Sequence, residues 1–179
     1  MSSQRLATPL TTVVTTALVL SIVSLTGCGP GGDLPPGHGV VEEVVDGDTL
    51  VITVGGRKET VRLIGIDTPE TKDPRVPVMC FGPEASARLG ELTPPGSEVR
   101  LELDVEVRDR YDRLLAYVHR AGDDLFVNLA MVEEGLADSV SYPPNETYRP
   151  VFDAAASDAR AKQRGLWAAC GGIETPIEP

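Results

Sequence analysis

The sequence predicts an α+β domain of five β-strands and three α-helices. Alternating apolar and polar residues mark three strands in the first part of the chain and two more further on. Segments with helical spacing follow the third strand once and the fifth strand twice. This order of elements favours a small five-stranded β-barrel of the OB type, although periodicity alone leaves other α+β arrangements open.

The first three strands are expected at residues 40–45, 49–54 and 57–66. Their alternation has the period of a strand with one buried face. A Gly-Gly pair joins the second strand to the third, as in a tight β-hairpin turn. On the third strand, Arg62 stands between apolar neighbours. That placement on a stiff element indicates a fixed position rather than a role in solubility.

The first helix is expected over Gly82–Leu92. Proline suits its first turn, the following glutamate complements the positive end of the helix dipole, and Pro-Pro-Gly ends it. The fourth strand follows at Glu98–Asp104, and its inward positions are expected to be Val99, Leu101 and Leu103.

The second half of the chain continues with a strand at Leu114–His119 and a helix over residues 127–135. The last helix is expected over 148–163, because a glycine two residues later is a typical helix stop. The globular domain thus covers residues 40–170, and residues 171–179 are expected to form a disordered, frayed tail.

The chain has 179 residues, of which 41% are hydrophobic and 24% charged, as in one globular domain with a real core. Its formal net charge of −11 would repel a phosphate ligand. This charge argues against tight, processive nucleic-acid binding and leaves binding that is local or mediated by a cation.

The N-terminal segment has the character of a targeting signal. Arg5 is its only charge before Cys28, and Leu-Thr-Gly before that cysteine is similar to the lipobox of bacterial lipoproteins. A permanent transmembrane helix is the alternative, but the small residues before Cys28 favour cleavage after residues 1–27. The resemblance implies a lipid on Cys28, a flexible tether over residues 28–39, and an extracytoplasmic protein anchored in the cell membrane.

Two cysteines remain, Cys80 and Cys170. Outside the cytoplasm an even remainder is best interpreted as one disulfide. Two free thiols are less compatible with an oxidising compartment. Metal ligation is weaker still, because neither cysteine has a Cys or His neighbour at ligand spacing.

Acidic residues gather at the ends of the first strands. Asp46 and Asp48 precede the second strand, and Asp67 and Glu70 follow the third. Antiparallel pairing brings these strand ends together, so the carboxylates should converge and need a cation between them. Asp46, which precedes a glycine, is expected to form the turn rather than to bind the ion. The pattern predicts a site for a hard cation.

Several motifs occur in the order found in the staphylococcal nuclease family, which the chain resembles over residues 40–168. These motifs are Asp-Gly-Asp-Thr at 46–49, Arg-Leu-Ile-Gly-Ile-Asp-Thr-Pro-Glu-Thr at 62–71, Gly-Pro-Glu-Ala-Ser-Ala at 82–87, Asp-Arg-Tyr-Asp-Arg-Leu-Leu-Ala-Tyr at 109–117, Val-Asn-Leu-Ala-Met-Val-Glu-Glu-Gly-Leu-Ala at 127–137 and Gly-Leu-Trp at 165–167. The resemblance implies an OB-fold barrel and a calcium-dependent nuclease that hydrolyses DNA and/or RNA to 3′-phosphate products.

Site residues follow from the matched positions. The family's Ca²⁺ ligands correspond to Asp48, Asp67 and the backbone carbonyl of Thr68. Its general base and its two catalytic arginines correspond to Glu70, Arg62 and Arg113. Calcium prefers several oxygen ligands, and two guanidinium groups can stabilise the charge that develops on a phosphoryl group.

Tyr111 and Tyr142 are expected either to contact substrate or simply to pack. One departure from the family is Asp112, which replaces the usual glycine before Arg113 and adds negative charge there. The expectation is a monomer that acts on DNA and/or RNA and is attached to a membrane by its lipid. The alternatives are a catalytically weak or inactive binding module on the same barrel, and an unrelated calcium-stabilised surface lipoprotein.

Overall fold

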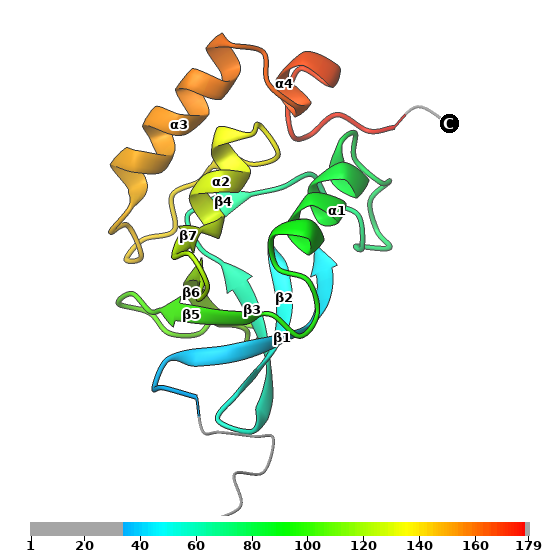
Figure 1. Ribbon diagram of the computed structural model, residues 1–179. Coiled ribbons are helices and arrows are strands. Elements are labelled where there is room, and N and C mark those ends of the chain that lie inside the picture. The colour runs from blue at the N-terminus through cyan, green and yellow to red at the C-terminus, as the bar shows by residue number, and fades with distance from the viewer. Residues whose placement is uncertain (1–33, 178–179) are drawn as a thin grey trace, which may run out of the picture. The chain divides into compact units, whose positions relative to one another are not determined.

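The computed structural model describes residues 34–177 as a β-barrel with helices at one end (Figure 1). The predicted α+β fold with an OB-type barrel is confirmed. Five strands form the barrel wall: β1 (His38–Asp46), β2 (Thr49–Val54), β3 (Arg57–Leu63), β5 (Glu98–Glu102) and β6 (Leu114–Arg120).

The barrel closes through one parallel pairing. The other wall strands pair antiparallel in the order β3-β2-β1-β5-β6, and β3 then pairs with β6, with Arg62 opposite Leu115. A short strand, β7 (Leu125–Phe126), extends β6 on its other side. Closure removes the free edges that an open sheet would expose.

Two register shifts bend β1. They lie between Val41 and Glu43 and between Val44 and Asp46. Such bulges bend a strand and re-aim the side chains that follow. The second shift stands directly before the Asp46-Gly47-Asp48 turn, so it directs this acidic turn toward the end of the barrel where β3 finishes.

Four helices lie beyond that end: α1 (Gly82–Leu92), α2 (Val127–Glu133), α3 (Arg149–Ala161) and α4 (Leu166–Ala169). The first packs on β1, the second on β6, and α3 packs on α2 (Figure 1). Three of them were predicted. The single-turn helix α4 was not, because four residues are too few to show a helical period.

A buried amide joins the helices to the barrel. Asn128, in the first turn of α2, accepts a hydrogen bond from the Val118 N–H and donates one to the Ile64 carbonyl, both at 2.9 Å. These bonds satisfy backbone groups at the point where β3 ends and where β6 has no strand partner for that N–H. They therefore fix the chain directly after Arg62.

The third strand is shorter than predicted. It ends at Leu63, and Ile66–Asp67 forms a separate strand, β4, which pairs with β8 (Asp138–Ser139). Gly65 has a φ of 80° and lies against the ring of Phe152, where a Cβ would clash, so the chain turns there. Alternation could not reveal this turn, because residues on both sides of it are buried and apolar.

The predicted inward position of Leu103 is wrong, since 46% of this residue is exposed. The strand β5 ends one residue earlier, and the chain then leaves the barrel. Beyond it, the Asp104 carboxylate accepts a hydrogen bond from the Tyr117 hydroxyl at 2.9 Å. Val99 and Leu101 are buried as expected.

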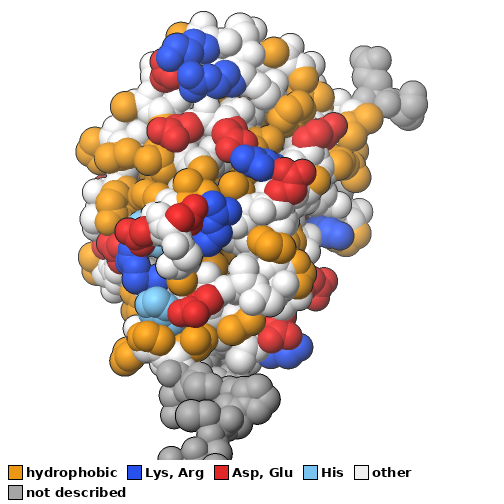
Figure 2. Space-filling model, viewed as in Figure 1, with side chains coloured by type: hydrophobic (Ala, Val, Ile, Leu, Met, Phe, Trp, Pro, Cys, Tyr) orange, Lys and Arg blue, Asp and Glu red, His pale blue; other side chains and the backbone are white. Residues whose placement is uncertain are grey.

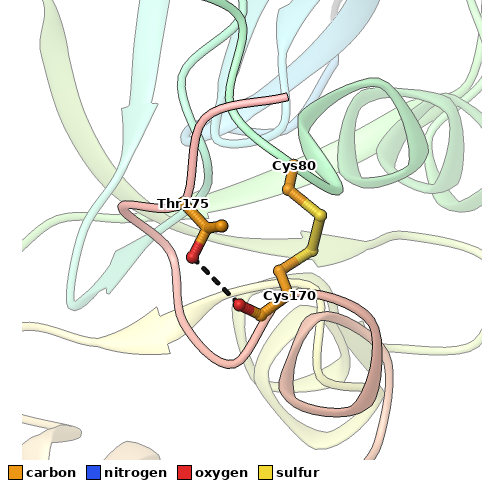
Figure 3. The surroundings of a disulfide bond; sticks show 3 residues. All are labelled: Cys80, Cys170 and Thr175. Atoms are coloured by element: carbon orange, nitrogen blue, oxygen red, sulfur yellow. Dashed lines mark hydrogen bonds between the residues drawn. A yellow bond between two sulfur atoms is a disulfide. The ribbon is translucent and has the colours of Figure 1, made fainter. Parts of the chain in front are cut away.

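The C-terminal segment differs from the predicted frayed tail. Residues 175–177 run antiparallel to residues 78–80, with Met79 opposite Pro176. The Cys80–Cys170 disulfide is present close to this pairing (Figure 3). Pairing with a loop almost a hundred residues away leaves no signal in the local sequence, which is why the tail could not be recognised as ordered. Residues 178–179 lie outside the described part.

The predicted signal peptide (1–27), the lipid-bearing Cys28 and most of the tether lie outside the described residues, and they stay predictions. Within 34–177, none of the helices combines the length and the apolar character that a membrane span requires.

The disulfide should contribute strongly to stability, because it joins residues that are 90 positions apart. In the chain-entropy model such a link adds about 4 kcal/mol to the free energy of unfolding. We expect the double variant Cys80→Ser/Cys170→Ser to melt roughly 10 °C below the oxidised protein in scanning calorimetry. Wild-type protein reduced with dithiothreitol should have the same melting temperature as the variant. Equal melting temperatures for the oxidised wild-type protein and the variant would contradict this role of the disulfide.

Candidate active site

All predicted catalytic and metal-binding residues line one polar cavity of about 220 Å³, at the end of the barrel where β3 and β4 meet the helices. The lining residues are Asp46, Asp48, Arg62, Asp67, Thr68, Pro69, Glu70, Arg113 and Tyr142. The strand register explains part of this convergence, because Thr49 stands opposite both Asp46 on β1 and Arg62 on β3. The barrel thus brings residues from five segments of the chain to one place.

Asp48 is buried and held by several donors. Its Oδ2 accepts hydrogen bonds from the backbone N–H and the hydroxyl of Thr68, at 3.1 and 3.0 Å. The same oxygen lies 3.0 Å from Nη2 of Arg62, and Oδ1 accepts a bond from the Thr49 hydroxyl. The carboxylate is therefore fixed in both position and orientation before any ligand binds.

Arg62 is almost fully buried, with 6% of the residue exposed. Its Nη2 bridges Asp48 and Asp67, and its Nη1 donates to the carbonyls of Leu63 and Ile66 at 2.6 and 3.0 Å. Burial lowers the pKa of the guanidinium, but the carboxylates beside it outweigh this effect and hold the pKa above its ordinary value. Arg62 is a rigid, permanent cation.

The Asp46-Gly47-Asp48 turn packs closely against Thr68 and Ala85. A Cβ on Gly47 would lie 2.7 Å from the Thr68 hydroxyl and 2.9 Å from the Ala85 Cβ, so only glycine fits there. Asp46 accepts the Asp48 N–H at 3.2 Å, as expected of a turn-forming aspartate. It also lines the cavity, however, so it belongs to the site as well as to the turn.

Two of the carboxylates hold protons more tightly than usual. Burial, and then the charge of Asp48, raise the pKa of Asp46 to about 6. Burial also raises the pKa of Asp67 to about 6, together with Asp48 and Glu70, although Arg62 opposes the shift. Crowded carboxylates of this kind are stabilised in the ionised form by an additional cation.

The donor set fits a hard cation. Every group that could bind an ion here is an oxygen, which suits a hard cation rather than zinc or copper. Within residues 34–177, no three acidic, histidine or cysteine side chains converge closely enough to hold an ion unaided. An ion at Asp48 and Asp67 would therefore take further ligands from a backbone carbonyl such as that of Thr68, from water and from substrate, as calcium commonly does.

Glu70 stands at the mouth of the cavity on the loop after β4. Its Oε1 accepts the backbone N–H groups of Thr71, Lys72 and Asp73, at 2.8, 2.6 and 3.0 Å. Burial raises the pKa of Glu70, but these three hydrogen bonds lower it more, and the result lies below the ordinary value. Oε2 has no hydrogen-bond partner within the described chain and is available for a water molecule.

Arg113 approaches from the opposite side, on the loop before β6. Its backbone N–H and its Nε both donate to Asp109, at 2.9 and 2.7 Å. The Asp109 carboxylate also accepts the Tyr111 N–H at 2.9 Å, so this one side chain stabilises the turn of the loop over residues 109–113. The two terminal nitrogens of Arg113 make no hydrogen bond to residues 34–177, and the residue is part of the cavity wall.

Comparison with known proteins agrees with this arrangement. Residues 60–169 match the family model described as staphylococcal nuclease homologue. The chain belongs to this family of nucleases. It is 44% identical to a thermonuclease of Staphylococcus intermedius over 128 residues, which cover 72% of this chain and 74% of the relative. It is 36% identical to a thermonuclease of Staphylococcus hyicus over 170 residues (92% and 98%), and 38% identical to the endonuclease YncB of Bacillus subtilis over 135 residues (74% and 63%).

Asp112, the departure from the nuclease family's usual glycine, adopts a φ of 65°, the left-handed conformation that glycine favours. Its side chain is 88% exposed and approaches Arg108 at 3.7 Å. It does not line the catalytic cavity. Its negative charge is thus directed to solvent and to Arg108, and away from the polar cavity.

The two tyrosines differ in position. Tyr142 lines the catalytic cavity, with its ring 5.8 Å from the Arg62 guanidinium carbon. Tyr111 is 62% exposed and lies at the rim, where Arg110 and Arg113 pack on its ring at 4.7 and 5.6 Å. Of these two tyrosines only Tyr142 lines the polar cavity, and Tyr111 lies exposed outside it.

A second cavity of about 130 Å³ adjoins the first and shares Arg62, Arg113 and Tyr142 with it. Its wall includes Asn145, which the sequence analysis did not select. Asn145 is buried, and its side-chain amide pairs with both the N–H and the carbonyl of Glu106. A proline-rich loop gave no sign of this role, because the partner is 39 residues away.

Proposed function

We propose that the protein is a calcium-dependent nuclease that hydrolyses phosphodiester bonds of DNA and/or RNA to 3′-phosphate products outside the cytoplasm. Membership of the staphylococcal nuclease family supports the nuclease activity. The observation that supports the proposal is the common cavity, whose wall combines two arginines and Glu70 with the carboxylate and carbonyl oxygens that a cation would need.

The two arginines divide the work of holding the phosphate. Arg62 is locked by Asp48 and Asp67 and presents its charge at a fixed place. Arg113 keeps its terminal nitrogens free, so it can donate two hydrogen bonds to a phosphate. Together they favour the transition state, in which negative charge spreads over the equatorial phosphoryl oxygens.

Glu70 is placed to act on the attacking water. Its lowered pKa keeps it ionised at neutral pH, and the three backbone donors fix one oxygen while leaving Oε2 free. A carboxylate with a low pKa is a weak base, so its main contribution is to orient the water and to receive its proton as the bond forms. A bound calcium ion would add positive charge beside the phosphate and lower the cost of bringing it to this acidic cavity.

The surface charge fits local rather than extended binding of nucleic acid. On the face shown in Figure 2, basic side chains are interspersed with acidic ones and form no continuous band. The net charge of −11 adds a general repulsion. Affinity should therefore come from the cavity, its cation and the rim around Tyr111, which favours a nuclease with little sequence preference.

The proposed location rests on two features. Residues 1–28 carry the signal-peptide and lipobox pattern, and Cys80 pairs with Cys170 as expected in an oxidising compartment. A monomer attached by a lipid on Cys28 is the simplest arrangement.

The decisive experiment incubates the purified protein with single-stranded DNA, duplex DNA and RNA, in calcium or in a calcium chelator. We expect cleavage in calcium only, with new 3′-phosphate ends that block extension by a polymerase until a phosphatase removes them. Absence of calcium-dependent cleavage at alkaline pH would refute the proposal. Binding without cleavage would instead support the inactive binding module.

Calcium affinity should depend on pH through Asp46 and Asp67, whose pKa values are raised to about 6. These carboxylates are protonated below pH 6, and protons then compete with the ion. We expect the apparent dissociation constant for calcium, measured by isothermal titration, to rise as the pH falls from 7 to 5, with uptake of calcium releasing protons near pH 6. A constant affinity across this range would contradict the assignment of Asp67 to the ion and the position of Asp46 in the same cavity.

A further inference from the structure

The loop that carries Glu70 has few anchors of its own. It runs from Glu70 to the start of α1, and residues 74–78 are all exposed, with prolines at two of these positions. Such a segment buries little apolar surface and is expected to open easily. A catalytic carboxylate, however, must keep its position within a fraction of an ångström. Contacts from outside the loop can supplement the hydrogen bonds that hold it from within.

Glu70 holds both ends of the loop. Its side chain accepts the N–H groups of Thr71, Lys72 and Asp73, and its carbonyl accepts the Met79 N–H at 2.8 Å. The loop therefore closes on the residue that it positions. Movement of residues 78–80 would pull on the Glu70 backbone directly.

Residues 78–80 are restrained by the C-terminal segment 175–177, which we name the strap. The Cys80 N–H donates to the Thr175 carbonyl at 2.7 Å, and the Ile177 N–H donates to the Val78 carbonyl at 3.0 Å. Between these bonds, Met79 stands opposite Pro176. The strap thus adds a short antiparallel partner to an otherwise unpaired part of the loop.

The disulfide anchors the strap. Cys170 is joined to Cys80, and its carbonyl accepts a hydrogen bond from the Thr175 hydroxyl at 3.0 Å (Figure 3). Thr175, the first strap residue, is only five positions beyond Cys170, so the strap cannot move far from the loop while the bridge is intact. Reduction would leave only a few exposed hydrogen bonds to hold it.

We propose that the strap and the Cys80–Cys170 bridge are positioning elements for Glu70. This inference rests on the proposed nuclease function, in which Glu70 acts on the attacking water. Neither Arg62 nor Arg113 lies on the loop, so loss of the strap leaves phosphate binding intact and spreads the Glu70 carboxylate over several positions. The turnover number should fall, while KM changes little.

Two variants test the strap. Cys80→Ser/Cys170→Ser removes the anchor, and Ile177→Pro removes the N–H that donates to Val78. Ile177→Ala is the matched control, because it shortens the same half-exposed side chain and keeps the N–H. All assays are run well below the melting temperature of each variant, so that global unfolding does not contribute.

We expect the double cysteine variant to lose about tenfold in kcat with KM within about twofold of wild type, and Ile177→Pro to lose less. Ile177→Ala should match wild type. A wild-type kcat in the folded double cysteine variant or in folded Ile177→Pro would overturn the positioning role. A change in KM without a change in kcat would overturn it as well.

Amide hydrogen exchange gives a second readout that does not depend on activity. The N–H groups of Thr71, Lys72, Asp73 and Met79 should exchange faster in the double cysteine variant, while those of β6 stay protected. Unchanged exchange in the loop would overturn the inference even if the protein is a nuclease. Failure of the wild-type protein to cleave nucleic acid would instead refute the proposed function, and exchange alone would then decide whether the strap holds the loop.

Discussion

Arg113→Ala is expected to lower kcat/KM for DNA by roughly 10³-fold while leaving the fold intact. Arg113 is the one arginine of the pair whose terminal nitrogens are free for a phosphate, and no other group in the cavity can replace its two-pronged contact. Within residues 34–177 its one ion-pair partner is Asp109, at a partly exposed position, and its guanidinium otherwise packs on the exposed ring of Tyr111, so little stability should be lost. Steady-state cleavage of a fluorescent oligonucleotide, together with a melting curve, measures both effects.

Two control variants separate charge from geometry. Arg113→Lys keeps the charge but loses the planar fork, and it should recover only a small part of the activity. Arg57→Ala removes an exposed arginine at the far end of the β2–β3 hairpin and should behave as wild type. An Arg113→Ala enzyme with near wild-type rates would remove Arg113 from the reacting centre.

Glu70→Gln is expected to lower kcat by about 10²- to 10³-fold with little change in KM. Glutamine has the same shape, and its side-chain oxygen can still accept the N–H groups of Thr71, Lys72 and Asp73, so the loop should keep its conformation. The lost quantity is the negative charge that orients the water and accepts its proton. Glu84→Gln, an exposed glutamate in the first turn of α1, is the matched control and should leave kcat unchanged.

The pH profile distinguishes Glu70 from Asp67, an expected ion ligand, and from Asp46 beside it. A base must be deprotonated, so its contribution disappears as the pH falls through its pKa, which for Glu70 lies below the ordinary 4.5. Asp46 and Asp67 titrate near 6 in the absence of the ion, so activity at low calcium should fall first in that range. Saturating calcium should move this fall in activity at acid pH, the acid limb of the profile, to lower pH. A limb that stays fixed at every calcium concentration would contradict this assignment.

The convergence of the site could be predicted because it depends on local patterns. Alternation located the hairpin strands, and antiparallel pairing then required the acidic turn and the residues after Ile66 to meet. The break between β3 and β4 escaped prediction, since Gly65 lies in an unbroken apolar run and its turn is imposed by Phe152. Helices and strands could be predicted wherever the spacing of apolar residues was regular over at least a full helical turn or a whole strand.

Other parts of the site depend on contacts between distant residues. Asn145 is fixed by Glu106, and the strap is fixed by residues 78–80, so neither local stretch shows its role. The sequence predicts only a turn-forming role for Asp46, because Asp-Gly is a common turn pair whether or not a ligand is bound. Its second role, as part of the cavity wall, becomes visible only when the closed barrel is known.

The parallel pairing of β3 with β6 has a consequence for how this enzyme family can diversify. Arg62 stands opposite Leu115, two positions from Arg113, so the β3–β6 pairing sets the spacing of the two backbones, and the bonds from Arg113 to Asp109 fix the second side chain. Insertions or deletions in loops outside residues 109–113 can therefore change the surroundings of the cavity, while the backbones that carry the two arginines stay in register.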